Sequence, residues 1–170
     1  MLRNVLRLVF FITASTTLKI KAETSVGHLI HADRIVVVKS THTMTLYARG
    51  RELKVYHVWL GRGTGKAKQQ RGDNETPEGD YTIIGRNAHS SAYLSLRISY
   101  PNAADLERAC RLHVDPGGDI MIHGLPPGND WVKPGQQLSD WTFGCIAVTN
   151  AEMDELWKLV PIGTPIEIRH

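Results

Sequence analysis

The chain has 170 residues, a length typical of one domain, and 42% hydrophobic residues, enough to build a core. Its formal net charge is +3 and its pI is about 9.0. Residues 1–22 contain four basic side chains and no acid, so the rest has sixteen basic and seventeen acidic residues and a net charge of −1. This balance argues against a basic surface for nucleic acid, and we expect no nucleic-acid partner.

Residues 1–22 have the pattern of an export signal. Arg3 and Arg7 give a positive start, residues 8–14 form a short apolar run, and Ala22 ends a weak match to a processing site. The run is shorter than the roughly twenty residues of a membrane span. The sequence therefore predicts a signal peptide over 1–22 and export to the periplasm or cell envelope. An uncleaved N-terminal anchor is the alternative.

Alternating and β-branched apolar runs recur between residues 34 and 168. Patterns of period two, and short apolar runs bounded by glycine or proline, are typical of strands. The expected strands are 34–39, 43–47, 53–60, 80–84, 93–100, 120–122, 146–148 and 164–168. The chain is thus predicted to be a mainly β domain.

Two short helices are expected between these strands. Asn102 can cap the first helix, over residues 103–111. Thr149 or Asn150 caps the second, because residues 149–152 fit a capping box. The apolar face of the second helix consists of Met153, Leu156, Trp157 and Val160.

The chain contains two cysteines, Cys110 and Cys145. An even count in an exported protein raises the question of a disulfide, but two cysteines in a domain of this length are not a disulfide framework. We expect Cys145 to be a free thiol. Cys110 is expected to pack with Leu106, four residues earlier, on one face of the first helix.

Candidate chemistry lies where two expected strands meet glycines. The run 120–122 ends in His123 and Gly124, and Gly144 and Cys145 open the run 146–148. A thiol at the start of one strand and an imidazole at the end of another can meet in space. The imidazole can then take the thiol proton, as in cysteine acyl transfer.

Three ordered elements resemble the YkuD-type L,D-transpeptidase domain, a family that remodels bacterial peptidoglycan. They are Thr76-Pro77-Glu78-Gly79-Asp80-Tyr81, His123-Gly124 and Thr142-Phe143-Gly144-Cys145-Ile146. The resemblance covers the chain from about residue 33 and implies a catalytic domain over 33–170. It also implies a β-sandwich with two short helices, and neither a cofactor nor a metal.

The resemblance implies a role for each central residue. Cys145 would be the nucleophile and His123 the general base and later acid. The thiol would attack a carbonyl of a peptidoglycan stem peptide and form a thioester, which passes to an amine acceptor. Water as the acceptor would make the protein an L,D-carboxypeptidase. Carbapenems acylate the cysteine of this family, so the same β-lactam reaction is expected here.

Further groups would support these two. In the family a backbone carbonyl orients the histidine, which here is that of Gly124; the side chain of Asp140 remains an alternative. The backbone N–H groups of Gly144 and of the cysteine after it would form an oxyanion hole. Thr142 would supply a supporting hydroxyl near the thiol.

Three aromatic residues are candidates for binding substrate. Tyr100 ends the strand 93–100 and either lines a cleft or serves only as a structural strand exit. Trp131 and Trp141 lie in the long segment between His123 and Cys145. Such segments often form cleft walls or lids, although both residues could instead pack only against their own loop.

The chain departs from the family pattern at two positions. Ala147 stands where the family commonly has arginine, and Phe143 where histidine is frequent. The combination resembles a divergent branch that includes hydrolases of the link between peptidoglycan and a covalently attached lipoprotein. Such an amidase, with a lipoprotein as partner, is therefore an alternative to the transpeptidase.

The sequence also contains features of two other classes of function. Asp115, Asp119, His113 and His123 are potential metal ligands, but their spacing matches no zinc motif. A non-catalytic module that binds the cell wall is the other alternative. The presence of both Cys145 and His123 argues against it.

Overall fold

The computed structural model describes residues 30–129, 131–136 and 139–170. The signal peptide expected over residues 1–22 lies outside this part of the chain. Within the described ranges, no helix combines the length and the apolar character needed to cross a membrane.

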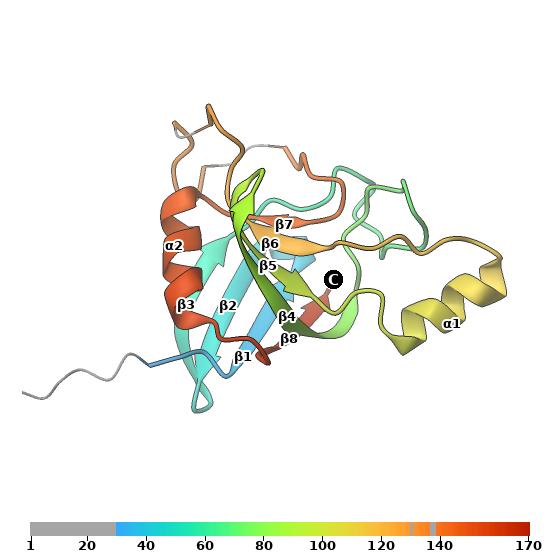
Figure 1. Ribbon diagram of the computed structural model, residues 1–170, viewed down its shortest axis with the longest axis horizontal. Helices are drawn as coiled ribbons and strands as arrows, with labels where there is room; N and C mark the ends of the chain where they lie inside the picture. Colours follow the sequence, from blue (N-terminus) through green and yellow to red (C-terminus); the bar gives the residue numbers. More distant parts are fainter. Residues whose placement is uncertain (1–29, 130, 137–138) are drawn as a thin grey trace, which may run out of the picture.

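In the described residues the architecture is a single sheet of eight strands with two helices, which confirms the predicted mainly β class (Figure 1). Its strand order is β3-β2-β1-β8-β4-β5-β6-β7. The elements are β1 Arg34–Val38, the 3-10 turn η1 Lys39–Thr41, β2 Thr43–Ala48, β3 Arg51–His57, β4 Gly79–Ser90, β5 Tyr93–Ile98, α1 Ala103–Leu112, β6 Met121–His123, β7 Ile146–Ala147, α2 Asn150–Leu159 and β8 Pro165–Arg169.

Strand β4 pairs with a different strand along each part of its length. Its residues 79–82 pair with β8, and its residues from Ile83 onward pair with β5. The sequence predicted only residues 80–84 as strand, because the second part is polar and exposed and is extended by its pairing with β5. The chain after β3 then meets β7, where Trp59 and Ala147 exchange two backbone hydrogen bonds of 3.0 and 2.8 Å. This contact brings the two ends of the strand order together.

The last strand, β8, is inserted into the middle of the sheet. It runs parallel to β1 and antiparallel to β4, with Ile166 and Ile168 buried in the core. A parallel neighbour needs a long crossover connection, and here nearly the whole domain lies between the two strands. The apolar alternation of β8 predicts a strand but not this position.

Helix α2 covers part of the core, as its apolar face predicts. Thr149 caps the helix, and the reciprocal capping box with Glu152 is present. Met153, Leu156 and Val160 are fully buried, among the apolar side chains of the strands. The side chain of Trp157 packs at the edge of this cluster.

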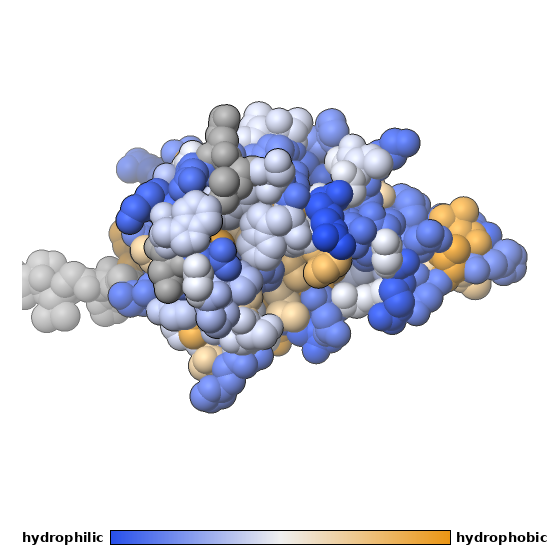
Figure 2. All heavy atoms as spheres, turned by 90° about the horizontal axis from the view of Figure 1, so that it is seen from above, coloured by the Kyte–Doolittle hydropathy of each residue, from blue (hydrophilic) through white to orange (hydrophobic). Residues whose placement is uncertain are grey.

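Helix α1 projects from the body of the domain, at the right of Figure 1. Asn102 caps it as predicted. The expectation that Leu106 and Cys110 pack was wrong, because Leu106 is 52% exposed and Cys110 is exposed too. The helix turns Asp105 toward the domain instead, where this buried carboxylate accepts a 3.0 Å hydrogen bond from the Tyr81 hydroxyl. Figure 2 shows apolar side chains at the surface of this end of the molecule.

Candidate active site

The pairing of β6 with β7 places the thiol and the imidazole on one face. The strands are parallel, with Ile122 opposite Ile146 and His123 opposite Ala147. Both isoleucines are fully buried. Because side chains alternate along a strand, His123 and Cys145 project from the other face. Strand spacing and rise put their Cα atoms roughly 8 Å apart, a distance that an imidazole and a thiol can span.

The imidazole of His123 is oriented by the carbonyl of Gly124. His123 Nδ1 lies 2.7 Å from the Gly124 oxygen. A carbonyl can only accept, so Nδ1 carries the proton and Nε2 presents its lone pair. Burial lowers the pKa of His123 below its ordinary value of 6.5, and the hydrogen bond to Gly124 only partly offsets this. The ring is therefore a neutral base at pH 7.

Asp140, the alternative acceptor for His123, has other partners. One of its carboxylate oxygens lies 3.0 Å from His42 Nε2. The other accepts a 2.8 Å hydrogen bond from the Leu60 N–H. Asp140 thus connects the segment before Cys145 to His42, which precedes β2, and to Leu60, which follows β3. The acceptor that orients His123 is therefore the Gly124 carbonyl.

The thiol of Cys145 is protonated in the resting site. Burial raises the pKa of Cys145 above its ordinary value of 9.0, and a backbone hydrogen bond from Met121 partly offsets this rise. The Cys145 Sγ lies 3.6 Å from the Asp119 carbonyl, to which it can donate. A half-buried neutral thiol of this kind needs a base before it can attack, and His123 is the neutral base on the same face.

Thr142 closes the turn that carries the thiol. Its buried hydroxyl donates to the Cys145 carbonyl at 2.7 Å and accepts a 3.1 Å hydrogen bond from the Gly144 N–H. The expected supporting hydroxyl is thus present beside the cysteine. The Gly144 N–H serves the turn, which leaves the Cys145 N–H as the remaining expected oxyanion donor.

Only glycine fits at position 144. A Cβ there would lie 2.6 Å from the Glu75 carbonyl oxygen, and the backbone has a φ of +122°. A Cβ on Gly61 would lie 2.1 Å from the Asn74 oxygen and 3.0 Å from the Gly144 Cα. Three stretches of backbone therefore pack directly on one another beneath Cys145, and a side chain would separate them.

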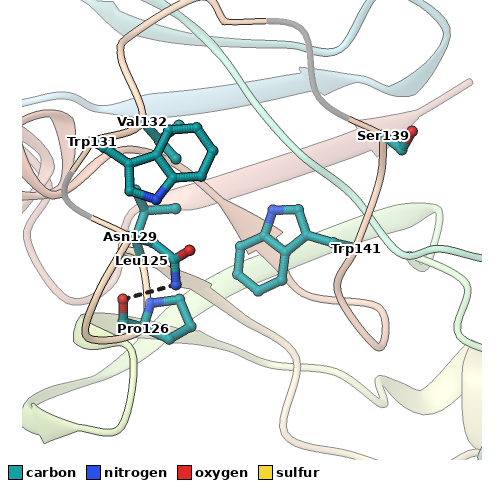
Figure 3. A pocket seen from close by; sticks show the side chains of 7 residues that line it. All are labelled: Leu125, Pro126, Asn129, Trp131, Val132, Ser139 and Trp141. Atoms are coloured by element: carbon teal, nitrogen blue, oxygen red, sulfur yellow. Dashed lines mark hydrogen bonds between the residues drawn. The ribbon is translucent and has the colours of Figure 1, made fainter.

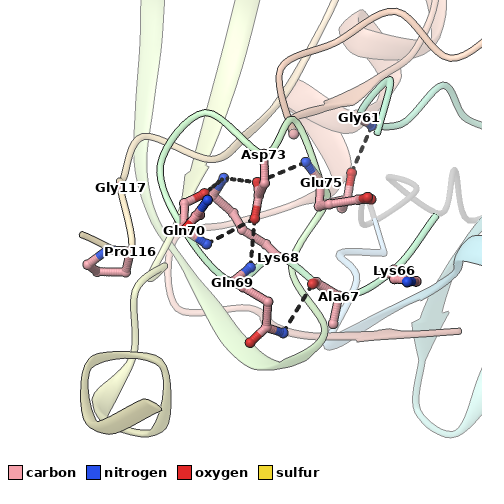
Figure 4. Close-up of polar contacts among 12 residues, drawn as sticks. Gly61, Lys66, Ala67, Lys68, Gln69, Gln70, Asp73, Glu75, Pro116 and Gly117 are labelled. Atoms are coloured by element: carbon pink, nitrogen blue, oxygen red, sulfur yellow. Dashed lines mark hydrogen bonds and ion pairs between the residues drawn. The ribbon is translucent and has the colours of Figure 1, made fainter. Parts of the chain in front are cut away.

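Buried charges hold one of these stretches, the loop before β4 (Figure 4). The Glu75 carboxylate accepts from the Thr64 hydroxyl at 2.8 Å and from the Gly65 N–H at 3.1 Å. Lys68, only 3% exposed, donates to Asp73 at 2.7 Å. These internal partners satisfy the buried ionic groups, so the glycine-rich loop is well fastened.

A cavity of about 350 Å³ lies between the segment after β6 and the segment before Cys145 (Figure 3). The indoles of Trp131 and Trp141 both border it, as the prediction that they cover a ligand requires. The ring of Trp141 also makes an edge contact with His123, at 5.8 Å between centroids. The remaining lining residues are Leu125, Pro126, Asn129, Val132 and Ser139.

Tyr100, the third aromatic candidate, does not line this cavity. It is 3% exposed, its hydroxyl donates to the Pro116 carbonyl at 2.8 Å, and its ring makes an edge contact with Tyr81. These contacts correct the expectation that Tyr100 lines a cleft. They agree with the alternative, in which Tyr100 serves only as a structural residue at the end of its strand.

Several contributions to the site were not predicted from the sequence. Met121 contacts the thiol through its backbone, and the Glu75 backbone carbonyl packs against Gly144. The Asn150 side chain accepts a 2.8 Å hydrogen bond from the Leu125 N–H. Each acts through a contact between distant segments, for which one sequence carries no local signal. Within the described part of the chain, no three His, Cys, Asp or Glu side chains gather as metal ligands.

Comparisons of sequence identify similar proteins. The sequence model of the YkuD family, described as the L,D-transpeptidase catalytic domain, matches residues 32–168. The chain is 32% identical over 132 residues to YafK of Escherichia coli (strain K12), a protein whose name assigns it provisionally to the L,D-transpeptidases. The match covers 74% of this chain and 46% of YafK, so the chain spans about half the length of the curated relatives it matches.

Solved structures share the fold. Pgp2 of Campylobacter jejuni, described as a helical cell shape determining protein, superposes with a TM-score of 0.60 at 22% identity, over 81% of this chain and 48% of Pgp2. L,D-transpeptidase 3 of Mycobacterium tuberculosis, solved with a faropenem-derived adduct, gives a TM-score of 0.55 at 18% identity, over 82% of this chain and 60% of that one. The predicted L,D-transpeptidase fold is thereby confirmed.

Proposed function

Because the chain belongs to the YkuD family of L,D-transpeptidase catalytic domains, we propose that it is a cysteine acyltransferase acting on the stem peptides of peptidoglycan. One observation carries the proposal. A neutral imidazole, fixed through Nδ1 by the Gly124 carbonyl, shares a face with the Cys145 thiol. A base with a free Nε2 beside a protonated thiol is the arrangement that cysteine acyl transfer requires.

The first half-reaction removes the last residue of the donor stem. Nε2 of His123 takes the thiol proton as Sγ of Cys145 attacks the peptide carbonyl, and the Cys145 N–H donates to the oxygen that becomes negative. The carbon–nitrogen bond then breaks. His123 returns the proton to the leaving amine, a terminal amino acid departs, and a thioester remains on Cys145.

The second half-reaction transfers the acyl group. An acceptor amine attacks the thioester carbonyl and gives up a proton to Nε2 of His123. The carbon–sulfur bond breaks, the proton returns to Sγ, and a new amide bond links two stems. Burial of both groups keeps thiol and imidazole neutral before substrate binds, so proton transfer accompanies attack rather than precedes it.

A hydrolase of the same family is the second candidate. Two observations favour it: Ala147, at the position of the common arginine, is completely buried against Trp59 and Leu125, and Phe143 replaces the frequent histidine and is exposed. Water would then replace the acceptor amine, giving an L,D-carboxypeptidase or an amidase that releases a lipoprotein from peptidoglycan.

We also propose that the protein is exported to the periplasm or cell envelope, where peptidoglycan lies, with residues 1–22 as its signal. Fractionation of cells that express the full chain tests this proposal. Recovery of the protein only in the cytoplasm would contradict it.

The decisive experiment incubates the protein with purified tetrapeptide muropeptides and analyses the products by mass spectrometry. Cys145→Ala is the matched control, with its fold checked by circular dichroism. We expect cross-linked dimers and loss of the terminal residue from the wild type and no product from the variant. Tripeptides without dimers would assign the hydrolase. Equal products from both proteins would refute the cysteine mechanism. No product from either protein, with tetrapeptides and with lipoprotein-linked peptidoglycan, would refute it too and favour a binding module.

Reaction with a carbapenem tests the nucleophile separately. The thiol would open the β-lactam ring and retain the whole molecule, so no leaving group is lost. We expect the intact wild-type protein to gain the mass of one carbapenem, mapped to Cys145, and Cys145→Ala to gain none. An adduct on Cys110 instead would contradict the assignment.

A further inference from the structure

A guanidinium group is held beside the turn that carries the nucleophile. The Cζ of Arg62 lies 4.3 Å from the centroid of the Phe143 ring, within cation–π distance. Phe143 is 68% exposed, a high value for a large apolar side chain. The Arg62 N–H also donates to the Thr142 carbonyl at 2.9 Å, so backbone and side chain both fasten Arg62 to this turn.

This guanidinium has no acidic partner among the described residues. By contrast, three other cations of this part of the chain each pair with an aspartate. Lys68 is buried and paired with Asp73. Arg97 pairs with Asp119 at 3.1 Å, and Arg71 with Asp115 at 2.7 Å. Stacking on an aromatic face leaves the edge of a guanidinium free, and its N–H donors match the two oxygens of a carboxylate.

The position of Arg62 relative to the thiol is constrained by the turn. Phe143 and Cys145 are two residues apart, so their Cα atoms are at most about 7 Å apart. The Thr142 hydroxyl fixes the geometry between them. Arg62 therefore presents its charge on the turn that carries the nucleophile.

The chemistry of the proposed substrate places an anion near the nucleophile. When a thiol attacks the last peptide bond of a chain, the leaving residue carries the terminal carboxylate. That carboxylate is separated from the scissile nitrogen by a single carbon atom. Arg62, fixed on the turn that carries the thiol, is a cation whose donors suit this group.

We propose that Arg62, stacked on Phe143, binds the terminal carboxylate of the donor peptide and selects peptides whose leaving residue has this group free. The inference rests on the proposed function, since it takes the attacked bond to be the last one of the stem. Arg62 and Phe143 would thus recognise the anion. Ala147, which is buried and apolar, cannot do so.

A binding experiment tests this without turnover. Cys145→Ala protein is titrated by calorimetry with two tetrapeptides that differ only at the end, one a free acid and the other a carboxamide. We expect the acid to bind roughly 10- to 100-fold more tightly, as for a charge-assisted hydrogen bond. Adding Arg62→Met, which keeps the length and apolar stem of the side chain, should reduce this ratio to near one.

The matched control is Arg34→Met in the same Cys145→Ala background. Arg34 also stacks on an aromatic ring, that of Tyr47 at 4.9 Å, at the far end of β1 and β2. This control should keep the full preference for the acid. Equal affinity for acid and amide before Arg62 is changed, or an unchanged ratio after Arg62→Met, would overturn the proposal.

Turnover by otherwise wild-type protein separates the two hypotheses. If the protein forms products, Arg62→Met should raise KM for the acid peptide with little change in its activity on the amide. Arg62→Lys should recover only part of the preference, since a lysine offers no planar fork. A preference for the acid in binding, without any product, would refute the proposed function and leave the carboxylate site in place.

Discussion

The turn that carries Cys145 and the strand end that carries His123 are held in place by different kinds of contact. The turn is enclosed by polar and backbone contacts. Thr142 closes it, and the backbones around Gly61 and Glu75 press against Gly144. Little room remains there for displacement.

The strand end has fewer constraints. One hydrogen bond to Gly124 sets the ring of His123, and the Trp141 ring contacts it at the border of a cavity. The Gly124 segment is fastened in turn by the Asn150 side chain. The difference suggests that changes on the cysteine side reduce stability and activity together. Changes on the histidine side should act mainly on the rate.

The largest effect is expected from Gly144→Ala. The new Cβ would meet the Glu75 carbonyl oxygen at 2.6 Å in a backbone conformation that alanine disfavours. We expect a loss of about 3 kcal/mol in the free energy of unfolding. Activity on muropeptides should fall about 100-fold or more, because the thiol is displaced. Denaturant unfolding and product assays measure the two effects.

Gly50→Ala is the control for this variant. Gly50 also has a positive φ, +73°, but nothing lies within 4 Å of a Cβ built on it. It should cost about 1 kcal/mol of stability from backbone strain alone and leave the activity unchanged. If Gly144→Ala behaves like Gly50→Ala, close packing beneath the thiol is not what holds the cysteine turn.

The next effect is expected from Thr142→Val. The buried Gly144 N–H would lose its acceptor, at a cost of about 1–3 kcal/mol in unfolding free energy. Since the same hydroxyl holds the Cys145 carbonyl, kcat should fall roughly tenfold or more. Thr142→Ser keeps the hydroxyl and should retain most activity. A larger loss in the serine variant than in the valine variant would show that the methyl group, not the hydroxyl, matters.

On the histidine side, Asn150→Ala should act on the rate more than on stability. The Leu125 N–H would lose its acceptor, which costs about 1 kcal/mol. The Gly124 carbonyl would then be less well placed to orient His123, and we expect kcat to fall about tenfold with little change in KM. Asn150→Asp keeps an acceptor oxygen and serves as control. A large loss of stability in the alanine variant would contradict the proposed contrast between the two sides.

The smallest effect concerns pH. Burial lowers the pKa of His123 below 6.5, so His123 stays a neutral base into mildly acidic solution and the acid limb of kcat/KM should have its midpoint below pH 6.5. The unfolded chain binds the proton more readily than the folded one. The stability that this provides is fully present above pH 6.5 and is lost as the pH falls through the folded pKa. His123→Gln should remove this part of the pH dependence of unfolding. An acid limb above pH 6.5 would contradict a buried neutral base.

The strands β1 and β2 and both helix starts could be predicted because their signals are local. Period-two alternation identifies strands, and the capping boxes at Asn102 and Thr149 need only residues within one turn. The three motif elements likewise indicated the family, and through it the Gly124 carbonyl as the partner of His123.

Other features could not be predicted, since they depend on pairings between distant segments. The exposure of Leu106 follows from the buried contact of Asp105 with Tyr81, which turns the polar face of α1 inward. Likewise, Tyr100 is buried because its hydroxyl reaches the Pro116 carbonyl. Amphipathic spacing alone gives no reason for either.

The mainly β class, the two capped helices and the pair of residues able to perform cysteine chemistry follow from the sequence, because each depends on side-chain type and short-range spacing. It takes the folded chain to show that β8 lies between β1 and β4, that a buried carboxylate holds the loop beneath the cysteine turn, and that Arg62 stacks on Phe143. These depend on backbones and charges far apart in the chain, whose contacts form only when burial brings them together and leaves their polar groups no partner but one another.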